Sequence, residues 1–217
     1  MIRTTVLRGP AGAELHLAGG VLGLAEDGPQ VERLLESQEF DAVFLGVPFE
    51  DLDAIRATNG QESGREFERD EMDEVYLKTL ARFGRTQVPP PDLYAAYDHA
   101  HRKKVRIEAV DLGDEGHSST YAENVGVFEI IRNNRRLKGL GPDAFSATDP
   151  EAFAREWDER LFPTKGLRKV QAAREGWMAK RIQELIPGAR RAFALVPLAR
   201  WAGVRNRLLD AGFRADL

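Results

Sequence analysis

Residues 28–47 read GPQVERLLESQEFDAVFLGV, and this stretch decides the class of the fold. Val31, Leu34 and Leu35 recur at helical spacing, which predicts an amphipathic helix from about Gly28 to Ser37. The run from Asp41 to Val47 is continuously apolar, as is typical of a strand in a sheet that is covered on both faces. A helix followed by such a strand indicates one half of a crossover unit.

The residues before this stretch supply the other half. Two short apolar runs, Ile2–Leu7 and Ala13–Leu17, are separated by the turn cluster RGPAG, which predicts a β-hairpin. A strand, a helix and a second strand then follow one another, which places the chain in the α/β class. We therefore expect a mostly parallel central sheet with helices on both faces and an N-terminal β-hairpin.

The rest of the chain predicts further helices and strands in one domain, residues 1–217. Residues 51–85 are charged and read as helical, with a break at Asn59-Gly60 and Ser63-Gly64, and Asp92 is placed to cap the next helix. The polar segment LGDEGHSSTY, residues 112–121, reads as a loop. Helices are expected at about 93–103, 122–137, 151–160, 166–185 and 203–211, and strands at 105–110 and 191–196.

Composition limits what the protein can do. The 217 residues include no cysteine, which excludes disulfides, thiolate metal sites and cysteine nucleophiles, and which fits a reducing compartment. The net charge of −4 lacks the basic excess of most nucleic-acid-binding proteins, so a nucleic-acid partner is not expected. The longest apolar stretches, such as 192–199, fall short of the ~20 residues of a membrane span, and MIRTTVLRGP lacks a signal-peptide core. We expect a cytoplasmic protein with no membrane partner.

An ordered set of five motifs resembles the TraB/Tiki family, which is related to the ChaN and erythromycin-esterase group. The motifs are Gly19–Leu22, Asp41–Gly46, Val110–Leu112, Ala173–Ile182, and Pro197–Arg200 followed by Gly203-Val204. In that family the first and last motifs carry Gly-x-x-His, the second ends in Glu, the third carries Asp-Arg and the fourth is an arginine helix. The resemblance spans nearly the whole chain and implies a TraB/Tiki-like fold with a metal-dependent, hydrolase-like site.

This sequence departs from the family pattern at three positions that should be catalytic. Leu22 and Arg200 stand where the family has histidines, and Gly46 stands where it has glutamate. Metal ligation needs lone pairs from imidazole or carboxylate, and neither leucine, glycine nor a guanidinium supplies one. The resemblance therefore implies a catalytically inactive domain, with no metal and no cofactor, that works by binding a protein partner, a second copy of itself or a small anionic ligand.

Four residues are the candidates for ligand binding: Glu50, Asp111, Arg174 and Arg200. If the two arginines line one cleft, they would attract a carboxylate or phosphate. Arg174 could equally pair with Glu175 or with another acid on its own surface. Glu50 follows the Asp41–Val47 strand directly, and Asp51 beside it could simply cap a helix.

A second hypothesis is an enzyme with a rebuilt site. Asp111, Glu115 and His117 follow a predicted strand at the edge where open α/β sheets bind ligands, and these side chains suit a divalent metal or acid–base chemistry. A solvated turn explains the same residues. His99 and His101 are expected on the surface of a helix. The sequence leaves open whether residues 139–165 lie over the cleft as a lid.

Overall fold

The computed structural model describes residues 2–57 and 71–215, so the predicted break at residues 59–64 lies outside the described part of the chain. The described strands form one six-stranded sheet in the order β4-β3-β5-β2-β1-β6. Strands β2, β5, β3 and β4 run parallel, whereas β1 is antiparallel to β2 and to β6. The strands are β1 (Arg3–Arg8), β2 (Glu14–Gly20), β3 (Ala42–Leu45), β4 (Arg106–Ala109), β5 (Arg191–Pro197) and β6 (Arg214–Ala215). The α/β class, the mostly parallel sheet and the N-terminal hairpin are confirmed.

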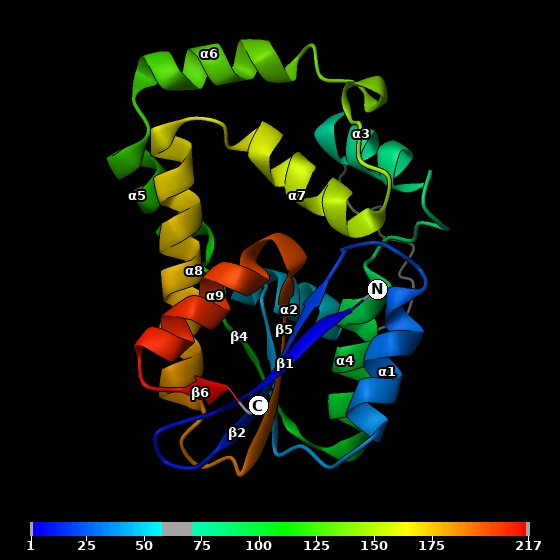
Figure 1. Ribbon diagram of the computed structural model, residues 1–217, viewed down its shortest axis with the longest axis vertical. Coiled ribbons are helices and arrows are strands. Elements are labelled where there is room, and N and C mark those ends of the chain that lie inside the picture. The colour runs from blue at the N-terminus through cyan, green and yellow to red at the C-terminus, as the bar shows by residue number, and fades with distance from the viewer. Residues whose placement is uncertain (1, 58–70, 216–217) are drawn as a thin grey trace.

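Helices cover both faces of the sheet, which explains why β3 is apolar at every position. On one face α1 (Asp27–Glu36) and α4 (Pro91–Lys103) pack together, and on the other α8 (Lys165–Leu185) and α9 (Leu198–Asp210) do so (Figure 1). Phe44 belongs to the core under α8 and α9, whereas Val43 and Leu45 belong to the core under α1 and α4. Successive strand residues point to opposite faces, so a strand between two helical layers must be apolar throughout.

A second layer lies beyond the carboxyl ends of the parallel strands (Figure 1). It contains α3, α5, α6, α7 and a short 3-10 helix, η1. An aromatic cluster centred on Phe153 of α7 holds part of this layer together: its ring lies 5.3 Å from that of Tyr76 and 5.4 Å from that of Phe145. Phe153 is fully buried. These elements are α3 (Glu71–Leu80), α5 (Asp114–Asn124), α6 (Val127–Leu137), η1 (Pro142–Ala144) and α7 (Pro150–Leu161), and α2 (Phe49–Ala57) follows β3.

The predicted loop at residues 112–121 is wrong, because α5 occupies most of it. No residue of α5 is buried, so the helix has no apolar stripe from which periodicity could reveal it. Asp114 and Glu115 stand in its first turn, where acidic side chains favour the positive end of the helix dipole. The acidic residues of its first turn are therefore the sequence signal of this helix.

Three other boundaries differ from the prediction. The helix expected at 122–137 is two helices, because Val125 and Gly126 are extended. Helix α9 begins at Leu198 and not at Gly203, directly after Pro197. Asp92 caps no helix: α4 already starts at Pro91, a residue suited to a first helical position, and Asp92 is buried inside its first turn.

The strand β6 was not predicted either, since two residues carry no alternation. In the described parts of the chain, no helix is long and apolar enough to cross a membrane.

Candidate functional site

A pocket of about 500 Å³ opens at the carboxyl ends of β2 and β5. Its floor is formed by the residues that end β2 and begin α9, and its walls come from α3, α7 and α8. The lining residues used below are Leu22, Tyr76, Trp157, Asp158, Gln171, Arg174, Leu198 and Arg200. Because Trp157 and Asp158 belong to the segment 139–165, this segment does form one wall over the sheet edge.

Apolar side chains make up most of the lining. Leu22, Trp157 and Leu198, the first residue of α9, are among them. Tyr76 also lines the pocket, and its hydroxyl donates to the carbonyl oxygen of Leu22 at 2.9 Å. This hydrogen bond leaves the ring as the main contact that Tyr76 offers to a ligand. Burial raises the pKa of Tyr76, so this hydroxyl stays protonated. A pocket of this composition suits a ligand with an apolar body.

Arg200 lies in the pocket wall, and its charge is already matched there. The residue is only 5% exposed. It donates to Oε1 of Glu175 at 3.0 Å and forms an ion pair with Asp158. Burial raises the pKa of both Asp158 and Glu175, and the positive charge of Arg200 opposes that shift. The guanidinium of Arg200, which we expected to bind an anionic ligand, is thus already paired with two carboxylates.

Arg174 is held by Asp111 through both carboxyl oxygens. Its Nε lies 3.3 Å from Oδ1, and its terminal nitrogen pairs with Oδ2. Asp111 is nearly inaccessible, and its Oδ1 also accepts from the backbone of Leu112 at 2.7 Å. Arg174 remains partly exposed and lines the pocket, whereas Asp111 lies behind it. The alternative pairing of Arg174 with Glu175 does not occur, because Glu175 faces Arg200.

Gln171 is a pocket residue that sequence reasoning missed. It is 4% exposed, and its Oε1 accepts from Arg174 at 3.2 Å, which orients the amide. Its Nε2 has no hydrogen-bond partner among the described residues. A buried donor left without an acceptor costs about 1–3 kcal/mol. One signal was available: Leu167, Val170 and Gln171 share the buried stripe of α8, and glutamine is the polar member of that stripe.

Acidic side chains gather beside the pocket, at the ends of β3 and β4. Glu50 accepts from the backbone of Asp114 at 3.1 Å, so this predicted binding residue ties α2 to α5. Burial raises the pKa of Asp51, and the charges of Asp114, Glu50 and Asp111 add to that effect. Asp51 lies in the first turn of α2. These acids lie close enough to repel one another.

Two of the three residues of the rebuilt-enzyme hypothesis come close together. His117 feels the charges of Asp111 and Arg174, and its pKa is lowered by burial first and by Arg174 second. Glu115 is exposed, and its side chain makes no hydrogen bond or ion pair with the described residues. Within residues 2–57 and 71–215, no group of three or more His, Asp or Glu side chains is arranged to hold a metal ion.

The other three histidines lie on β2 and α4. His16 of β2 contacts Oε1 of Glu14 at 2.7 Å. His101 is exposed as expected, but the surface prediction for His99 is wrong, because it is 4% exposed. His99 falls on the stripe of α4 that includes Ala96 and Ala100 and packs toward α1.

The three positions at which the sequence departs from the TraB/Tiki pattern lie around the end of β5. Leu22 and Arg200 line the same pocket. Gly46 lies against β5: a Cβ at this glycine would stand 2.9 Å from Cα of Val196 and 3.0 Å from Cδ of Pro197. Residues distant in the sequence thus share one edge of the sheet.

Comparison with known proteins adds no assignment, since no protein-family model matches the chain and no curated protein matches it.

Proposed function

We propose that this chain is a TraB/Tiki-like domain without metal-dependent catalysis, which binds a small ligand that has an apolar body and an anionic end. The observation that carries the proposal is the combination of the pocket's apolar lining with two side chains of α8: Gln171, whose buried amide nitrogen has no partner among the described residues, and Arg174, which is partly exposed. An ionised acceptor would satisfy this donor and lie near the guanidinium. Such charge-assisted hydrogen bonds are about twice as strong as neutral ones.

The rest of the lining supports the same ligand class. Trp157, Leu22 and Leu198 offer contacts to an apolar body, whereas Arg200 is neutralised by Asp158 and Glu175. Arg174 is also paired, with Asp111, but its side chain is more exposed than that of Arg200, at 23% against 6%. Gln171 and Arg174 therefore form the polar part of the lining that we assign to the anionic end of the ligand. A carboxylate on a chain or ring suits this arrangement better than a multiply charged phosphate.

The TraB/Tiki-like classification rests on the convergence of the departing positions. Leu22 and Arg200 line one pocket and Gly46 borders its floor at Pro197, as residues of a former common site should. None of the three supplies a metal ligand. Asp111 and Arg174, which the resemblance retains, are joined in an ion pair.

Octanoate is a suitable probe because it combines an apolar chain with one carboxylate. We expect octanoate to shift the side-chain amide resonance of Gln171 in a protein-observed NMR titration, and octan-1-ol to bind at least several-fold more weakly. The Gln171→Leu substitution keeps the volume and removes the donor, so it should weaken octanoate binding by about tenfold or more, since hydrogen bonds to charged groups contribute about 1.5–3 kcal/mol.

Gln183→Leu is the matched control on the same helix. The side-chain amide of Gln183 donates to the carbonyl oxygen of Ala179 at 3.1 Å, and Gln183 does not line this pocket. Equal affinity of octanoate for the Gln171→Leu and unsubstituted proteins would contradict the proposed pocket chemistry, as would shifts that avoid Gln171.

The enzyme with a rebuilt site around Asp111, Glu115 and His117 remains the alternative function. It requires a metal or a free acid–base pair, and Asp111 is engaged by Arg174. Elemental analysis by inductively coupled plasma mass spectrometry, before and after incubation with zinc, manganese and iron, separates the two. Stoichiometric metal lost on His117→Ala would favour the enzyme over the binding domain.

A further inference from the structure

Helix α6 lies at one end of the molecule (Figure 1), and three of its apolar side chains are exposed. Val127 is 69% exposed, Phe128 is 89% exposed and Ile131 is 45% exposed. The opposite side of the helix is anchored: Ile130 packs against the cluster of Val125, Leu167 and Val170. The exposed side chains therefore belong to a helix whose other face is held against α8.

Basic residues share this outward side. Arg132, Arg135 and Lys138 are exposed, and they follow Phe128 and Ile131 at the three- and four-residue spacing that keeps side chains on one face of a helix. We call Val127, Phe128, Ile131, Arg132, Arg135 and Lys138 the α6 surface. Its first half is apolar and its second half is basic.

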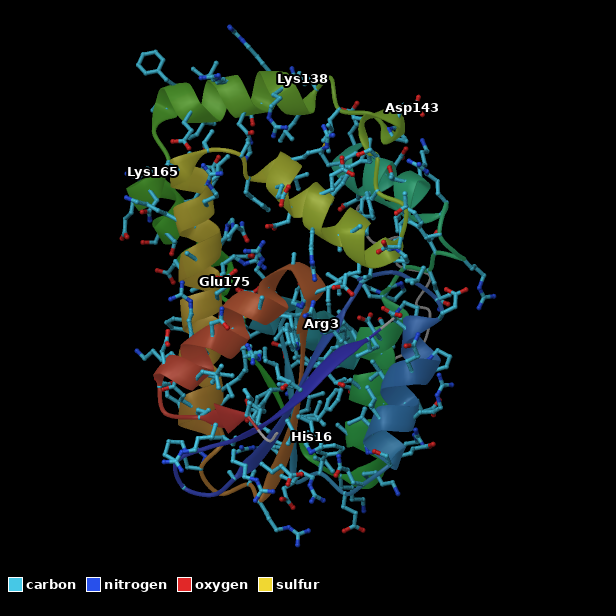
Figure 2. All side chains as sticks on the ribbon, viewed as in Figure 1. Arg3, His16, Lys138, Asp143, Lys165 and Glu175 are labelled. Atoms are coloured by element: carbon cyan, nitrogen blue, oxygen red, sulfur yellow. The ribbon has the colours of Figure 1, made fainter. Side chains whose placement is uncertain are left out.

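A second basic group lies at the start of α8. Lys165, Arg168 and Lys169 are exposed on the first turns of α8. Figure 2 shows Lys138 at the carboxyl end of α6 and Lys165 at the start of α8, both at the same end of the molecule. This end of the molecule thus carries positive charges on α6 and on α8.

The one acidic residue in the sequence of α6 does not cancel this charge at the surface. Glu129 accepts hydrogen bonds from the hydroxyl of Thr164 and from the backbone of Gly166 at 3.1 Å. Its carboxylate is thereby directed toward the start of α8. Glu123 of α5 is exposed and precedes α6. Even when it is counted, residues 123–138 hold four basic and two acidic side chains.

We propose that the α6 surface docks peripherally onto an anionic lipid bilayer. Aromatic and aliphatic side chains enter the boundary between headgroups and acyl chains, and lysine and arginine side chains attract anionic headgroups. A protein partner fits less well: α6 is 11 residues long, or about 16 Å, and its exposed residues form a ridge, whereas a stable protein interface buries about 800 Å² on each side. The docking is a surface contact and needs no membrane-spanning helix.

Vesicle flotation of the full chain tests this proposal. Vesicles of phosphatidylcholine with one quarter phosphatidylglycerol should carry the protein at 50 mM salt, and pure phosphatidylcholine vesicles should carry several-fold less. The net charge of −4 repels the chain as a whole from anionic vesicles, so binding would report a local surface. Phe128→Ser should lower partitioning by about tenfold, since the exposed ring supplies much of the apolar area.

Charge reversal tests the second half of the surface. Arg135→Glu should lower partitioning more than fivefold, because one basic side chain contributes about fivefold near an anionic surface and the reversal adds repulsion. Matched controls are Phe49→Ser, which removes another exposed ring (61%) on α2, and Lys103→Glu, which reverses another exposed charge on α4. Both controls should bind vesicles as the unsubstituted protein does.

Three results would overturn the proposal. The first is that the folded protein, checked by circular dichroism, fails to float with anionic vesicles at 50 mM salt. The second is that Phe128→Ser and Phe49→Ser lower binding equally. The third is that light scattering after size exclusion finds a dimer that Phe128→Ser alone dissociates, which would assign the α6 surface to a second copy of this chain.

Discussion

We expect Asp92→Asn to remove a large pH dependence from the stability of this fold. Asp92 is 0% exposed, and neither of its carboxyl oxygens has a hydrogen-bond partner among the described residues. It lies directly beneath the pocket floor, since a Cβ on Gly20 would stand 2.5 Å from its Oδ2. Asp27, also 0% exposed, is near enough for its charge to act on Asp92.

Burial first, and the charge of Asp27 second, raise the pKa of Asp92 from 3.8 to about 7. The folded protein therefore holds this proton more tightly than the unfolded chain. The stability that protonation supplies is fully present below pH 4 and is lost as the pH rises to about 7. A pKa difference of about three corresponds to a loss of about 4 kcal/mol, at about 1.4 kcal/mol for each pH unit.

Urea unfolding at half-unit intervals from pH 4.5 to pH 8 measures this loss. The unsubstituted protein should become less stable over the range relative to Asp92→Asn, and the difference between the two curves should level off above pH 7. Asparagine has the same shape and cannot ionise. Asp98→Asn is the control on the same helix, because Asp98 is exposed and pairs with Arg102 at 2.7 Å.

The comparison between variants isolates Asp92, because other titrating groups contribute to both curves alike. Parallel curves for Asp92→Asn and the unsubstituted protein would refute the reasoning: they would mean that Asp92 is ionised in both states, with partners that satisfy its charge. An Asp98→Asn curve that matches that of Asp92→Asn would point to a change in net charge and not to burial.

Two further substitutions follow from the packing around the pocket. Gly46→Ala should lower the unfolding free energy by about 1–3 kcal/mol, because its Cβ would meet the backbone of Val196 at 2.9 Å and overpacking costs this much. Gly141→Ala is its control, since nothing lies within 4 Å of a Cβ there, and equal losses in urea unfolding would contradict the cause. Arg200→Leu should cost about 3 kcal/mol at pH 7.5, since it leaves Asp158 and Glu175 without their buried partner. The loss should shrink at pH 5 as these carboxyls, whose pKa burial already raises, take up protons; an equal loss at both pH values would argue against unpaired charge.

Most of the fold could be predicted where burial imposes a period. The apolar run DAVFLGV and the stripe of Val31 and Leu35 exist because both elements contact the core, so each left a pattern in the sequence. Helix α5 left none, because it buries no residue. The register of β6 on Leu7 and Arg8 depends on a long-range pairing that two residues cannot encode locally.

The composition of the candidate site could not be read from the sequence. The sequence placed candidate residues after predicted strands, at the edge where open α/β sheets bind ligands. Which groups would be free there depended on pairings across the fold: Arg200 with Asp158 and Arg174 with Asp111 join residues far apart in the sequence. Gln171 was missed because its amide nitrogen is buried without a hydrogen-bond partner among the described residues. Only the three-dimensional structure shows a missing partner of this kind.

Gly46 decides how the departures from the family pattern should be interpreted. A side chain at this position would collide with the Cα of Val196, a backbone atom that cannot move aside as a side chain could. Glutamate at residue 46 would therefore require the backbone to shift close to the point where Gly46 donates to the carbonyl oxygen of Leu195 at 2.7 Å. A metal ligand at residue 46 is therefore opposed by the backbone of β5, in addition to being missing from the side chain. Histidines at Leu22 and Arg200 alone would not supply the carboxylate that the TraB/Tiki resemblance implies at this position.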